Sequence, residues 1–395
     1  MVDVALIGVG LVGKEVVRQL TSSALSPFFR IAGLSNSRHT VTIAPGAPTL
    51  YADTLLSLLP SSSAPLPSAS SHPAASYSPA NPSAVLDTLI HSRKTTGRAA
   101  VFVDCTSELS VAELYPRALS SGISVVTPNK KGFASNAELY KEILQAQAVP
   151  GAGLCYAEAT VGAGLPIHST LRDLLVTGDE VTKIEGVFSG TLSYLLNQYS
   201  PAEKADGPRP KFSEILREAK EHGHTEPHPA DDLSGADVAR KLTILARLVS
   251  TLSSSSTPAL PSLPDGYKSV DIQSLVPPAL DGVKDAREFV AGFEAYDSEF
   301  DRQRDEAAKE GKVLRYVGVI DRASGTISCK LEKYPLSHPF ASLSGSHLSI
   351  AFYTKRYAAR PLIVQGPGYP LAVTASAVVG DLIRVAERNG ARLGL

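Results

Sequence analysis

Short apolar runs alternate with amphipathic helical patterns through the first 150 residues of the chain. This alternation is typical of βαβ units, in which parallel strands form one sheet with helices packed on its faces. We therefore predict an α/β domain over residues 1–150, with strands at Val2–Gly8, Phe29–Leu34, Ala99–Cys105 and Ile123–Pro128.

One part of this domain has a different composition. Between Pro45 and Pro82 the chain is rich in Ser, Pro and Ala. The run Pro60–Pro67 cannot hold a regular helix or a central strand, because proline lacks the backbone N–H that both require. We interpret most of residues 45–82 as a surface insertion.

The pattern changes after Tyr156, and we predict a second domain over residues 151–365. A helix is expected at Phe212–His222, a loop at Gly223–Leu233, and a strongly apolar helix from Ser234 to about Leu252. Together with several strands, these helices indicate an α+β sheet domain. The expected strands are Thr182–Ser189, Leu314–Ile320, Gly325–Lys333 and His347–Tyr353.

The last 30 residues or so form a separate prediction. A strand at Leu362–Gln365, a Gly-Pro-Gly turn and a helix at Ala372–Asn389 make one βα pair. We expect this pair to return to the first domain, with residues 366–395 supplying its C-terminal helix.

The charged residues balance almost completely, with 38 Lys and Arg against 39 Asp and Glu. A net charge of -1 creates no field that would gather nucleic acid or an anionic membrane, so a small-molecule ligand is expected. Three dispersed cysteines, Cys105, Cys155 and Cys329, match neither a disulfide framework nor zinc-ligand spacing, and they fit a reducing compartment.

The hydropathy pattern indicates in which cellular compartment the protein is expected. The opening run Val4–Val9 lacks a basic lead-in and a cleavage site, so it is interpreted as a strand and not as a signal peptide. No stretch approaches the roughly 18 uncharged apolar residues of a spanning helix. By exclusion, the predicted location is the cytoplasm.

An apolar strand runs directly into the glycine motif Gly8-Val9-Gly10-Leu11-Val12-Gly13, and a helical pattern follows. Gly8 permits a tight turn, Gly10 lets the backbone approach a pyrophosphate, and Gly13 allows close packing of helix on strand. The helix N-terminus presents N–H groups to the phosphates. An ordinary glycine-rich turn is the alternative, but this context favours a dinucleotide.

Other polar residues follow the later strands. No acid stands where the second strand ends, whereas Arg38 could pair with a 2′-phosphate, which favours NADP(H) over NAD(H). Thr106 and Lys130 follow the third and fourth predicted strands, where ligands of such sheets bind. Simple solvent exposure is the alternative for both Arg38 and Lys130.

Acidic residues and a lysine gather around the start of the apolar helix of the second domain. Carbonyl reduction needs a proton donor for the developing alkoxide and carboxylates for a cationic substrate amino group. Asp237 and Lys241 are four residues apart and project from one helix face. The alternatives are a capping box at Ser234–Asp237 and an ordinary helix-surface ion pair. The histidines His222, His224 and His228 lack zinc-like spacing.

Several blocks of the sequence resemble those of monofunctional homoserine dehydrogenases, most closely those of the fungal type. The blocks that carry the resemblance span nearly the whole chain; they are Glu158–Pro166, Gly186–Tyr194, Thr225–Pro227, Asp231–Lys241 and Ser337–Gly345. The resemblance implies a Rossmann-type nucleotide-binding domain, a catalytic and dimerisation domain, and a homodimer. The implied reaction is the NAD(P)H-dependent interconversion of L-aspartate 4-semialdehyde and L-homoserine in threonine, methionine and isoleucine biosynthesis.

The resemblance also implies roles for individual residues. Lys241 would donate and accept the proton with Asp237 beside it, and Thr106 and Lys130 would lie at the junction of nicotinamide and substrate. The implied substrate-binding residues are Glu226, Gly190, Thr191, Asp232 and Gly223, with Asp237 also contacting the substrate. A monovalent cation, usually sodium in this family, would be coordinated by Glu158, Val161, Ala163 and Leu165, whose oxygen donors suit a hard cation. Gly366 and Gly368 are further cofactor-binding candidates.

Three positions depart from the family pattern. His224 stands where Tyr is frequent, His228 replaces a small polar residue, and Tyr369-Pro370 interrupts a glycine-rich run. Because the first two do not touch the proposed acid/base pair, we expect tuning of the site and not loss of function. Two other functions stay open: a catalytically silent NADP-binding regulator, and a dehydrogenase for a related amino-acid semialdehyde.

Overall fold

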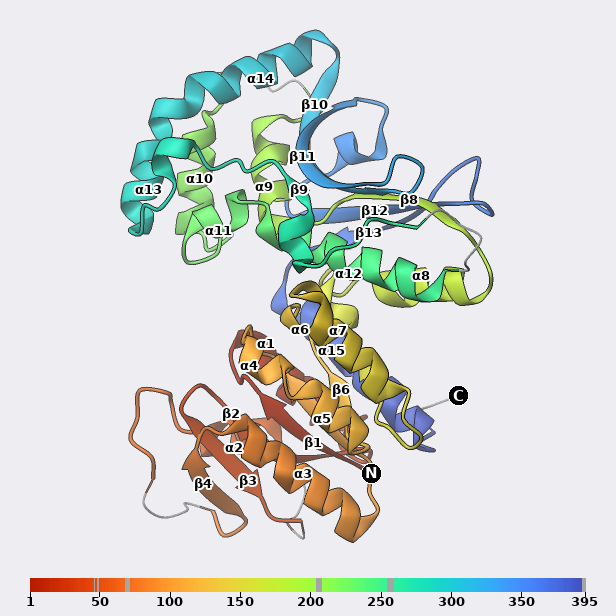
Figure 1. Cartoon of the computed structure of the whole chain (residues 1–395). Coiled ribbons are helices and arrows are strands. Elements are labelled where there is room, and N and C mark those ends of the chain that lie inside the picture. Colours follow the sequence, from red (N-terminus) through yellow and green to blue (C-terminus); the bar gives the residue numbers. More distant parts are fainter. Residues whose placement is uncertain (46, 48–49, 68–71, 204–207, 254–258, 393–395) are drawn as a thin grey trace. The chain divides into compact units, whose positions relative to one another are not determined.

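The computed structural model describes residues 1–45, 47, 50–67, 72–203, 208–253 and 259–392 (Figure 1). The chain forms two compact units. The first comprises Met1–Gly164 together with the segment that begins at Pro370, and the second comprises Leu165–Tyr369. The predicted α/β and α+β fold classes are confirmed.

A seven-stranded sheet forms the centre of the first unit, in the order β4-β3-β2-β1-β5-β6-β7. Strands β2, β1, β5, β6 and β7 are neighbours in the sheet and pair in parallel. Strands β3 and β4 extend the sheet beyond β2 as antiparallel strands. Their bounds are β1 (Val2–Ile7), β2 (Phe29–Ser35), β3 (His39–Ile43), β4 (Ala75–Pro79), β5 (Ala100–Asp104), β6 (Ser124–Val126) and β7 (Cys155–Tyr156).

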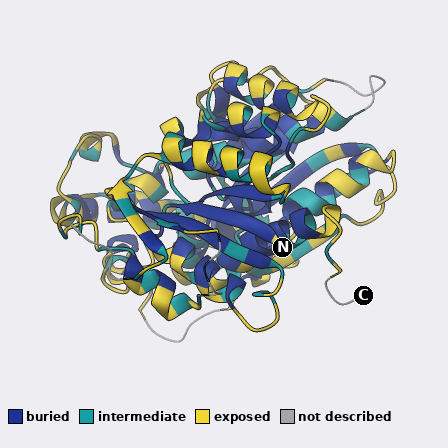
Figure 2. Ribbon diagram, turned by 90° about the horizontal axis from the view of Figure 1, so that it is seen from below, coloured by how far each residue is buried: buried dark blue, intermediate teal, exposed yellow. Residues whose placement is uncertain are grey.

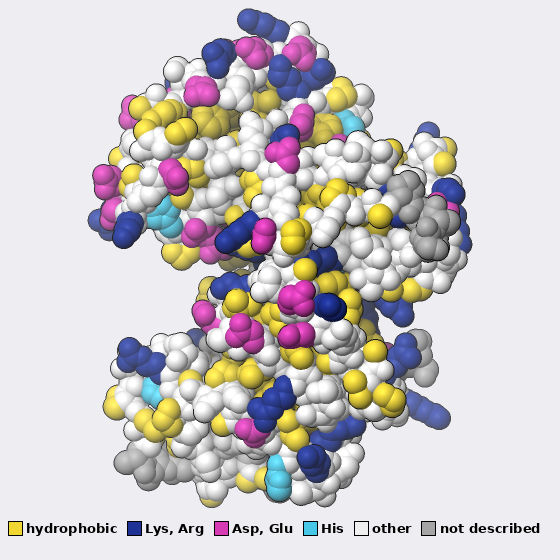
Figure 3. All heavy atoms as spheres, in the orientation of Figure 1, with side chains coloured by type: hydrophobic (Ala, Val, Ile, Leu, Met, Phe, Trp, Pro, Cys, Tyr) yellow, Lys and Arg dark blue, Asp and Glu magenta, His cyan; other side chains and the backbone are white. Residues whose placement is uncertain are grey.

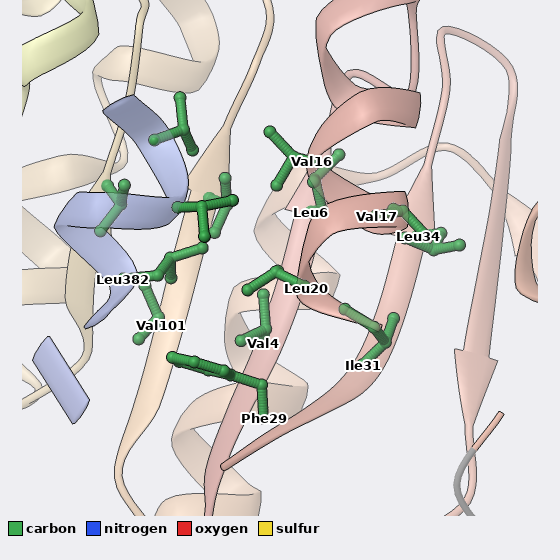
Figure 4. Packing of buried hydrophobic residues seen from close by; sticks show 14 of the residues in the cluster. Val4, Leu6, Val16, Val17, Leu20, Phe29, Ile31, Leu34, Val101 and Leu382 are labelled. Atoms are coloured by element: carbon green, nitrogen blue, oxygen red, sulfur yellow. The ribbon is translucent and has the colours of Figure 1, made fainter. Parts of the chain in front are cut away.

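Helices cover both faces of this sheet because successive strand residues point to opposite sides. Val4 and Leu6 belong to a core that includes Val16 and Leu382, whereas Ala5 faces the helix that carries Leu89 (Figure 4). The helices are α1 (Leu11–Leu20), α2 (Ala52–Leu58), α3 (Pro82–Thr96), α4 (Leu109–Ala112), α5 (Tyr115–Ser120), α6 (Lys131–Ala134), α7 (Ala137–Gln147) and α15 (Leu371–Arg388).

The segment interpreted as an insertion has more structure than its composition predicts. Residues 52–58 form helix α2, which buries Leu55 and Leu58. The run Pro60–Pro67, for which no regular helix or central strand was predicted, contains neither. Strand β4 also lies in the segment, but at the edge of the sheet, where proline is tolerated. Residues 46, 48–49 and 68–71 lie outside the described residues.

The second unit contains a six-stranded sheet in the order β13-β12-β8-β10-β11-β9, antiparallel except for the pair β11 and β9. Its strands are β8 (Val181–Val187), β9 (Asp271–Ile272), β10 (Lys312–Asp321), β11 (Thr326–Pro335), β12 (His347–Thr354) and β13 (Leu362–Pro367). Strand β13 pairs with β12 in the second unit, as the predicted bounds 151–365 imply, so the idea that the whole βα pair returns to the first domain is wrong. Only the helix after it, α15, belongs to the first unit.

Helix α12 packs on one face of this second sheet, where Gly318 of β10 leaves room for Leu242. On the other face, Val187 and Val317 pack against Phe340 and Leu343. Figure 2 shows buried strands beneath helices whose outer sides are exposed. The helices are α8 (Ile167–Val176), α9 (Gly190–Tyr199), α10 (Phe212–Glu221), α11 (Pro229–Leu233), α12 (Ala236–Leu252), α13 (Ala286–Gly292) and α14 (Asp297–Lys309).

The surface agrees with the balanced composition. Basic and acidic side chains are interspersed on the face drawn in Figure 3. Among the described residues, none of the helices combines the length and the apolar character that crossing a membrane requires.

Candidate active site

The glycine motif lies where strands β1 and β5 end side by side. Gly8 follows β1 with φ +89°, and a Cβ at this position would lie 2.7 Å from the backbone carbon of Cys105. A Cβ on Gly13 would lie only 2.3 Å from the carbonyl oxygen of Gly8. Both glycines are therefore required by close approaches of backbone within the first unit.

Gly10 differs from these two glycines, because a Cβ there would meet no atom within 4 Å. Helix α1 begins at Leu11 without a side-chain cap, and Leu11 is 72% exposed. The first N–H groups of a helix point outward and attract anions. The open space at Gly10 and the uncapped N-terminus of α1 together suit the pyrophosphate of a dinucleotide.

Arg38 lies in the turn between β2 and β3. The side chain of Asn36 shapes this turn by accepting hydrogen bonds from the amides of Arg38 (2.9 Å) and His39 (2.8 Å). Arg38 is exposed, as a residue that meets a 2′-phosphate would be. Ser35, the last residue of β2, is by contrast fully buried, and its hydroxyl oxygen lies 2.9 Å from that of Thr40.

Thr106 and Lys130 lie on the loops that follow β5 and β6. The Thr106 hydroxyl donates to the buried carboxylate of Asp104 at 2.7 Å. Lys130 directly precedes α6, and its carbonyl accepts hydrogen bonds from Phe133 and Ala134. The structure therefore places both residues at the carboxyl edge of the parallel strands of the first unit, as predicted.

In the second unit, Lys241 and Asp237 form a direct ion pair on α12. The Lys241 Nζ lies 2.6 Å from Oδ2 of Asp237 and donates to the carbonyl oxygen of Phe188 at 2.7 Å. The Lys241 side chain is only 12% exposed, whereas that of Asp237 is 39% exposed. The ammonium group is thus held from two sides with little contact with solvent.

The loop before α12 folds onto the start of α9. Thr191, in the first turn of α9, donates its hydroxyl hydrogen to the carbonyl of His224 at 3.0 Å. The Glu226 amide donates to Oδ2 of Asp232 at 2.8 Å. Gly190 lies beside Thr191, and Gly223 ends α10 with φ +72° immediately before His224. These contacts bring the predicted substrate-binding residues together near the ion pair.

Asp232 has an unusual environment. Burial, with a smaller contribution from the nearby acids Glu226 and Asp237, raises the pKa of its carboxyl group to about 6. The hydrogen bond from the Glu226 amide acts in the opposite direction. Three carboxyl groups near one ammonium group give this site an excess of negative charge, which suits a cationic amino group.

The structure rules out one alternative and one expectation for this region. Gly235, with φ +74°, is the N-cap of α12 and makes no side-chain cap, so Ser234 and Asp237 do not form a capping box. A Cβ on Gly235 would lie 2.1 Å from the hydroxyl of Tyr316, which explains why glycine stands there. The segment expected as a loop at Gly223–Leu233 contains the short helix α11.

Glu158 and Ala163 lie in the turn proposed from the resemblance to bind a cation. Glu158 is buried, and its carboxylate lies 3.3 Å from the Arg384 guanidinium of α15. Ala163 has φ +56°, a conformation that non-glycine residues rarely adopt. Val161 is buried in the first unit, and Leu165 begins the second. Among the described residues, no group of three His, Cys, Asp or Glu side chains could hold a metal ion.

Comparison with known proteins decides the family. A family model described as "Homoserine dehydrogenase" matches residues 166–383, and one described as "Homoserine dehydrogenase, NAD binding domain" matches residues 8–157. The chain is 40% identical over 388 residues to homoserine dehydrogenase of Saccharomyces cerevisiae, which covers 98% of this chain and 99% of the relative. The chain belongs to the homoserine dehydrogenase family.

Other relatives agree with this assignment. Homoserine dehydrogenase of Schizosaccharomyces pombe is 48% identical over 302 residues, or 76% of each chain. A solved structure of a Candida auris protein of unknown function is similar with a TM-score of 0.82, 38% identity and 98% coverage of both chains. A hyperthermophilic archaeal homoserine dehydrogenase in complex with NADPH matches with a TM-score of 0.64, but at 21% identity it shows the fold alone.

One departure from the pattern of homoserine dehydrogenases now has a structural explanation. The Nδ1 atom of His228 accepts a hydrogen bond from the Ala230 amide at 3.3 Å and caps α11. Small polar residues are the usual N-caps, so the histidine serves the purpose of the residue it replaces.

The other two departures also have defined places in the structure. His224 packs its ring against Tyr194, with the ring centroids 4.5 Å apart. Pro370 is the N-cap of α15 and needs no N–H there.

The cap predicts the outcome of two substitutions. His228→Ala is expected to lower the free energy of unfolding by about 1 kcal/mol, because the Ala230 amide loses its acceptor. His228→Ser restores an acceptor and is expected to recover most of this loss. Urea denaturation of the three proteins checks this. Equal losses for alanine and serine would show that ring packing against Phe289, with centroids 5.1 Å apart, matters instead.

Two groups near the site were not found from the sequence. The Phe188 carbonyl that accepts from Lys241 is a backbone atom, and no side-chain pattern signals it. The buried Asp104 contacts Thr106, Tyr115 and Asn129, which are separated by up to 25 residues. Its one signal in the sequence is an acid at the end of an apolar strand.

Proposed function

We propose that this protein interconverts L-homoserine and L-aspartate 4-semialdehyde with NADP(H), as a step in threonine, methionine and isoleucine biosynthesis. The observation that carries this proposal is the Lys241–Asp237 ion pair, held against the Phe188 carbonyl beside the acid-rich loop. Family membership supports the reaction type, oxidation at a CH–OH group.

The chemical step assigns a role to each group. When bound, NADPH supplies the hydride. Lys241 donates a proton to the aldehyde oxygen as negative charge develops on it, and it accepts the proton in the reverse direction. Asp237 orients the Lys241 ammonium group at 2.6 Å. Glu226, Asp232 and Asp237 attract the substrate amino group, while Gly190, Thr191 and Gly223 shape the loops around it.

Asp232 makes the substrate step depend on pH. Because its pKa is raised to about 6, the carboxyl group is neutral below that pH and pairs poorly with an ammonium group. We expect KM for homoserine to rise about tenfold per pH unit below 6 and to be constant above about pH 7. Initial rates with saturating cofactor from about pH 5 to 8 check this. A profile of Asp232→Asn that keeps the same inflection would assign it to another group.

The direct test of the proposed function is turnover by the purified protein. Oxidation of NADPH with aspartate semialdehyde, and reduction of NADP by homoserine at alkaline pH, are both expected. Absence of turnover in both directions with both dinucleotides would favour the silent regulator. Turnover only with a longer semialdehyde would favour the related dehydrogenase.

Arg38 is proposed to select NADPH, because it is exposed in the turn after β2 and no acid follows that strand. Arg38→Ala is expected to raise KM for NADPH about 10- to 100-fold and to leave KM for NADH unchanged, since a hydrogen bond to a charged group contributes about 1.5–3 kcal/mol. Arg18→Ala is the matched control, because Arg18 is exposed on α1 and pairs with Glu15. Equal effects of Arg38→Ala on both cofactors would contradict the assignment.

The remaining cofactor contacts are proposed from the glycine motif. The amides around Gly8, Val9, Gly10, Leu11, Val12 and Gly13 would hold the pyrophosphate, and Thr106 and Lys130 the nicotinamide end. Gly366 lies in β13 and Gly368 just beyond it, and both stay predictions as cofactor contacts.

A monovalent cation, sodium, is proposed at the oxygen donors of Glu158, Val161, Ala163 and Leu165. The Arg384 guanidinium competes for the Glu158 carboxylate, and the Leu165 carbonyl also accepts from the Ile167 amide at 2.9 Å. Equal rates in sodium chloride and choline chloride would argue against the cation. A homodimer is proposed from the resemblance, and analytical ultracentrifugation tests it.

A further inference from the structure

Asp104 is a fully buried acid at the end of β5, and its carboxylate accepts four hydrogen bonds. Its Oδ1 accepts from the amide and the hydroxyl of Thr106, at 2.8 and 2.7 Å. Its Oδ2 accepts from the Tyr115 hydroxyl at 2.5 Å and from the Asn129 side-chain amide at 2.9 Å. All four partners are donors, which suits an ionised carboxylate because it is an acceptor only.

These contacts join two loops that are far apart in the sequence. Thr106 lies on the loop after β5, and Asn129 lies on the loop after β6. The Asn129 amide nitrogen also donates to the Glu108 carbonyl at 2.9 Å, and its oxygen accepts from the Lys131 amide at 3.0 Å. Lys130 therefore lies between two residues that are both fixed by this network.

A purely local role for Asp104 would need fewer contacts. The bond to the Thr106 amide alone is an ordinary Asx turn that shapes one loop. The bond to Asn129 adds nothing to that turn, yet it connects the carboxylate to the segment that carries Lys130. Burial raises the pKa of Asp104, while the hydrogen bonds from Tyr115, Thr106 and Asn129 act in the opposite direction.

We propose that Asp104 is a positioning residue, whose buried carboxylate sets the two loops so that Thr106 and Lys130 meet the nicotinamide end of the cofactor. This inference rests on the proposed function, because that function places Thr106 and Lys130 at the nicotinamide. It also predicts that the adenosine end, held by the Gly8–Gly13 motif and Arg38, does not depend on Asp104.

The test separates the two ends of the cofactor. Asp104→Asn places an amide N–H₂ group against donors and removes the charge that orients them. We expect Kd for NADPH to rise about 10-fold and kcat to fall about 100-fold, as for a misplacement of about 1 Å. Kd for 2′,5′-ADP, which carries only the adenosine end, is expected to stay within about twofold of wild type. Titration calorimetry measures both constants without turnover.

Tyr115→Phe is the matched control. It removes one hydrogen bond from the same buried carboxylate but leaves the contacts to Thr106 and Asn129 in place. We expect it to lower the unfolding temperature while both dissociation constants stay near wild type. If Asp104→Asn weakens NADPH and 2′,5′-ADP equally, or if Tyr115→Phe reproduces its kinetic effect, Asp104 only stabilises the unit and the proposal is overturned.

Asn129→Ala keeps the proposal testable even where Asp104→Asn does not fold. It deletes the link to the Lys130 loop and leaves the other three donors on Asp104, so the same selective loss of NADPH affinity is expected. Where both variants fold, their effects on NADPH binding are expected to be less than additive in the double variant, because one link is removed twice. Full additivity would contradict the link. A wild type without homoserine turnover would refute the proposed function, yet these binding results would still decide the role of Asp104.

Discussion

Replacing Lys241 by alanine is expected to lower kcat by about 10²–10⁴-fold in both directions while Kd for NADPH stays near wild type. The reason is the location of the ammonium group, which is 12% exposed and fixed between Asp237 and the Phe188 carbonyl. No other lysine lies within four residues of Lys241 on α12. Stopped-flow and steady-state rates in both directions measure the loss.

The control for this variant is on the same helix. Arg240→Gln also removes a positive charge from α12, but Arg240 stacks over the Tyr267 ring at 4.5 Å. We expect kcat of Arg240→Gln to stay near wild type with a small loss of stability. Near-normal turnover by Lys241→Ala, or loss that follows unfolding alone, would reject Lys241 and direct attention to Glu226 and Asp232.

The second large effect is expected at the glycine motif, where two alanine substitutions should fail in different ways. Gly10→Ala is expected to fold normally, since its φ of -87° suits alanine and a Cβ meets no atom within 4 Å. The methyl group would occupy the space that the pyrophosphate needs, so Kd for NADPH should rise by about 100-fold. Calorimetric titration with NADPH measures this change.

Gly13→Ala is expected to fail through stability. Its Cβ would lie 2.3 Å from the Gly8 carbonyl oxygen, so α1 must move away from β1, at a cost of about 1–3 kcal/mol. Chemical denaturation measures that loss. Should Gly10→Ala bind NADPH as wild type does, the open space in front of Gly10 is not the pyrophosphate site.

The glycine motif was predictable because its signal is local. A strand, a turn with positive φ and a helix follow one another within 20 residues, and each has its own sequence pattern. The α12 ion pair was predictable for the same reason, since helical spacing brings Asp237 to Lys241. The family resemblance then supplied roles that spacing alone left open.

Features that depend on tertiary contacts were not predictable in this way. The capping box considered as an alternative at Ser234 does not form, because the approach of Tyr316 to Gly235 decides how α12 begins. Helix α2 forms in a proline-rich segment because Leu55 and Leu58 have a core to enter. Strand β13 belongs to the second unit and not to the first domain, because the strand it pairs with, β12, lies in the second sheet. The periodicity of apolar residues along the chain does not indicate which distant residues or strands an element will contact.

The position of α15 has a consequence for the order of folding during synthesis. This helix supplies Val378, Leu382 and Val385 to the core of the first unit, although it follows the whole of the second unit in the sequence. Figure 4 shows Leu382 in this core. Domains generally fold as they leave the ribosome, N-terminal domain first. Here the N-terminal sheet is translated long before the helix that covers it, whereas the second unit is contiguous in sequence. The sheet face that α15 covers therefore stays exposed until this helix has been synthesised, and the second unit is able to fold before the first is complete.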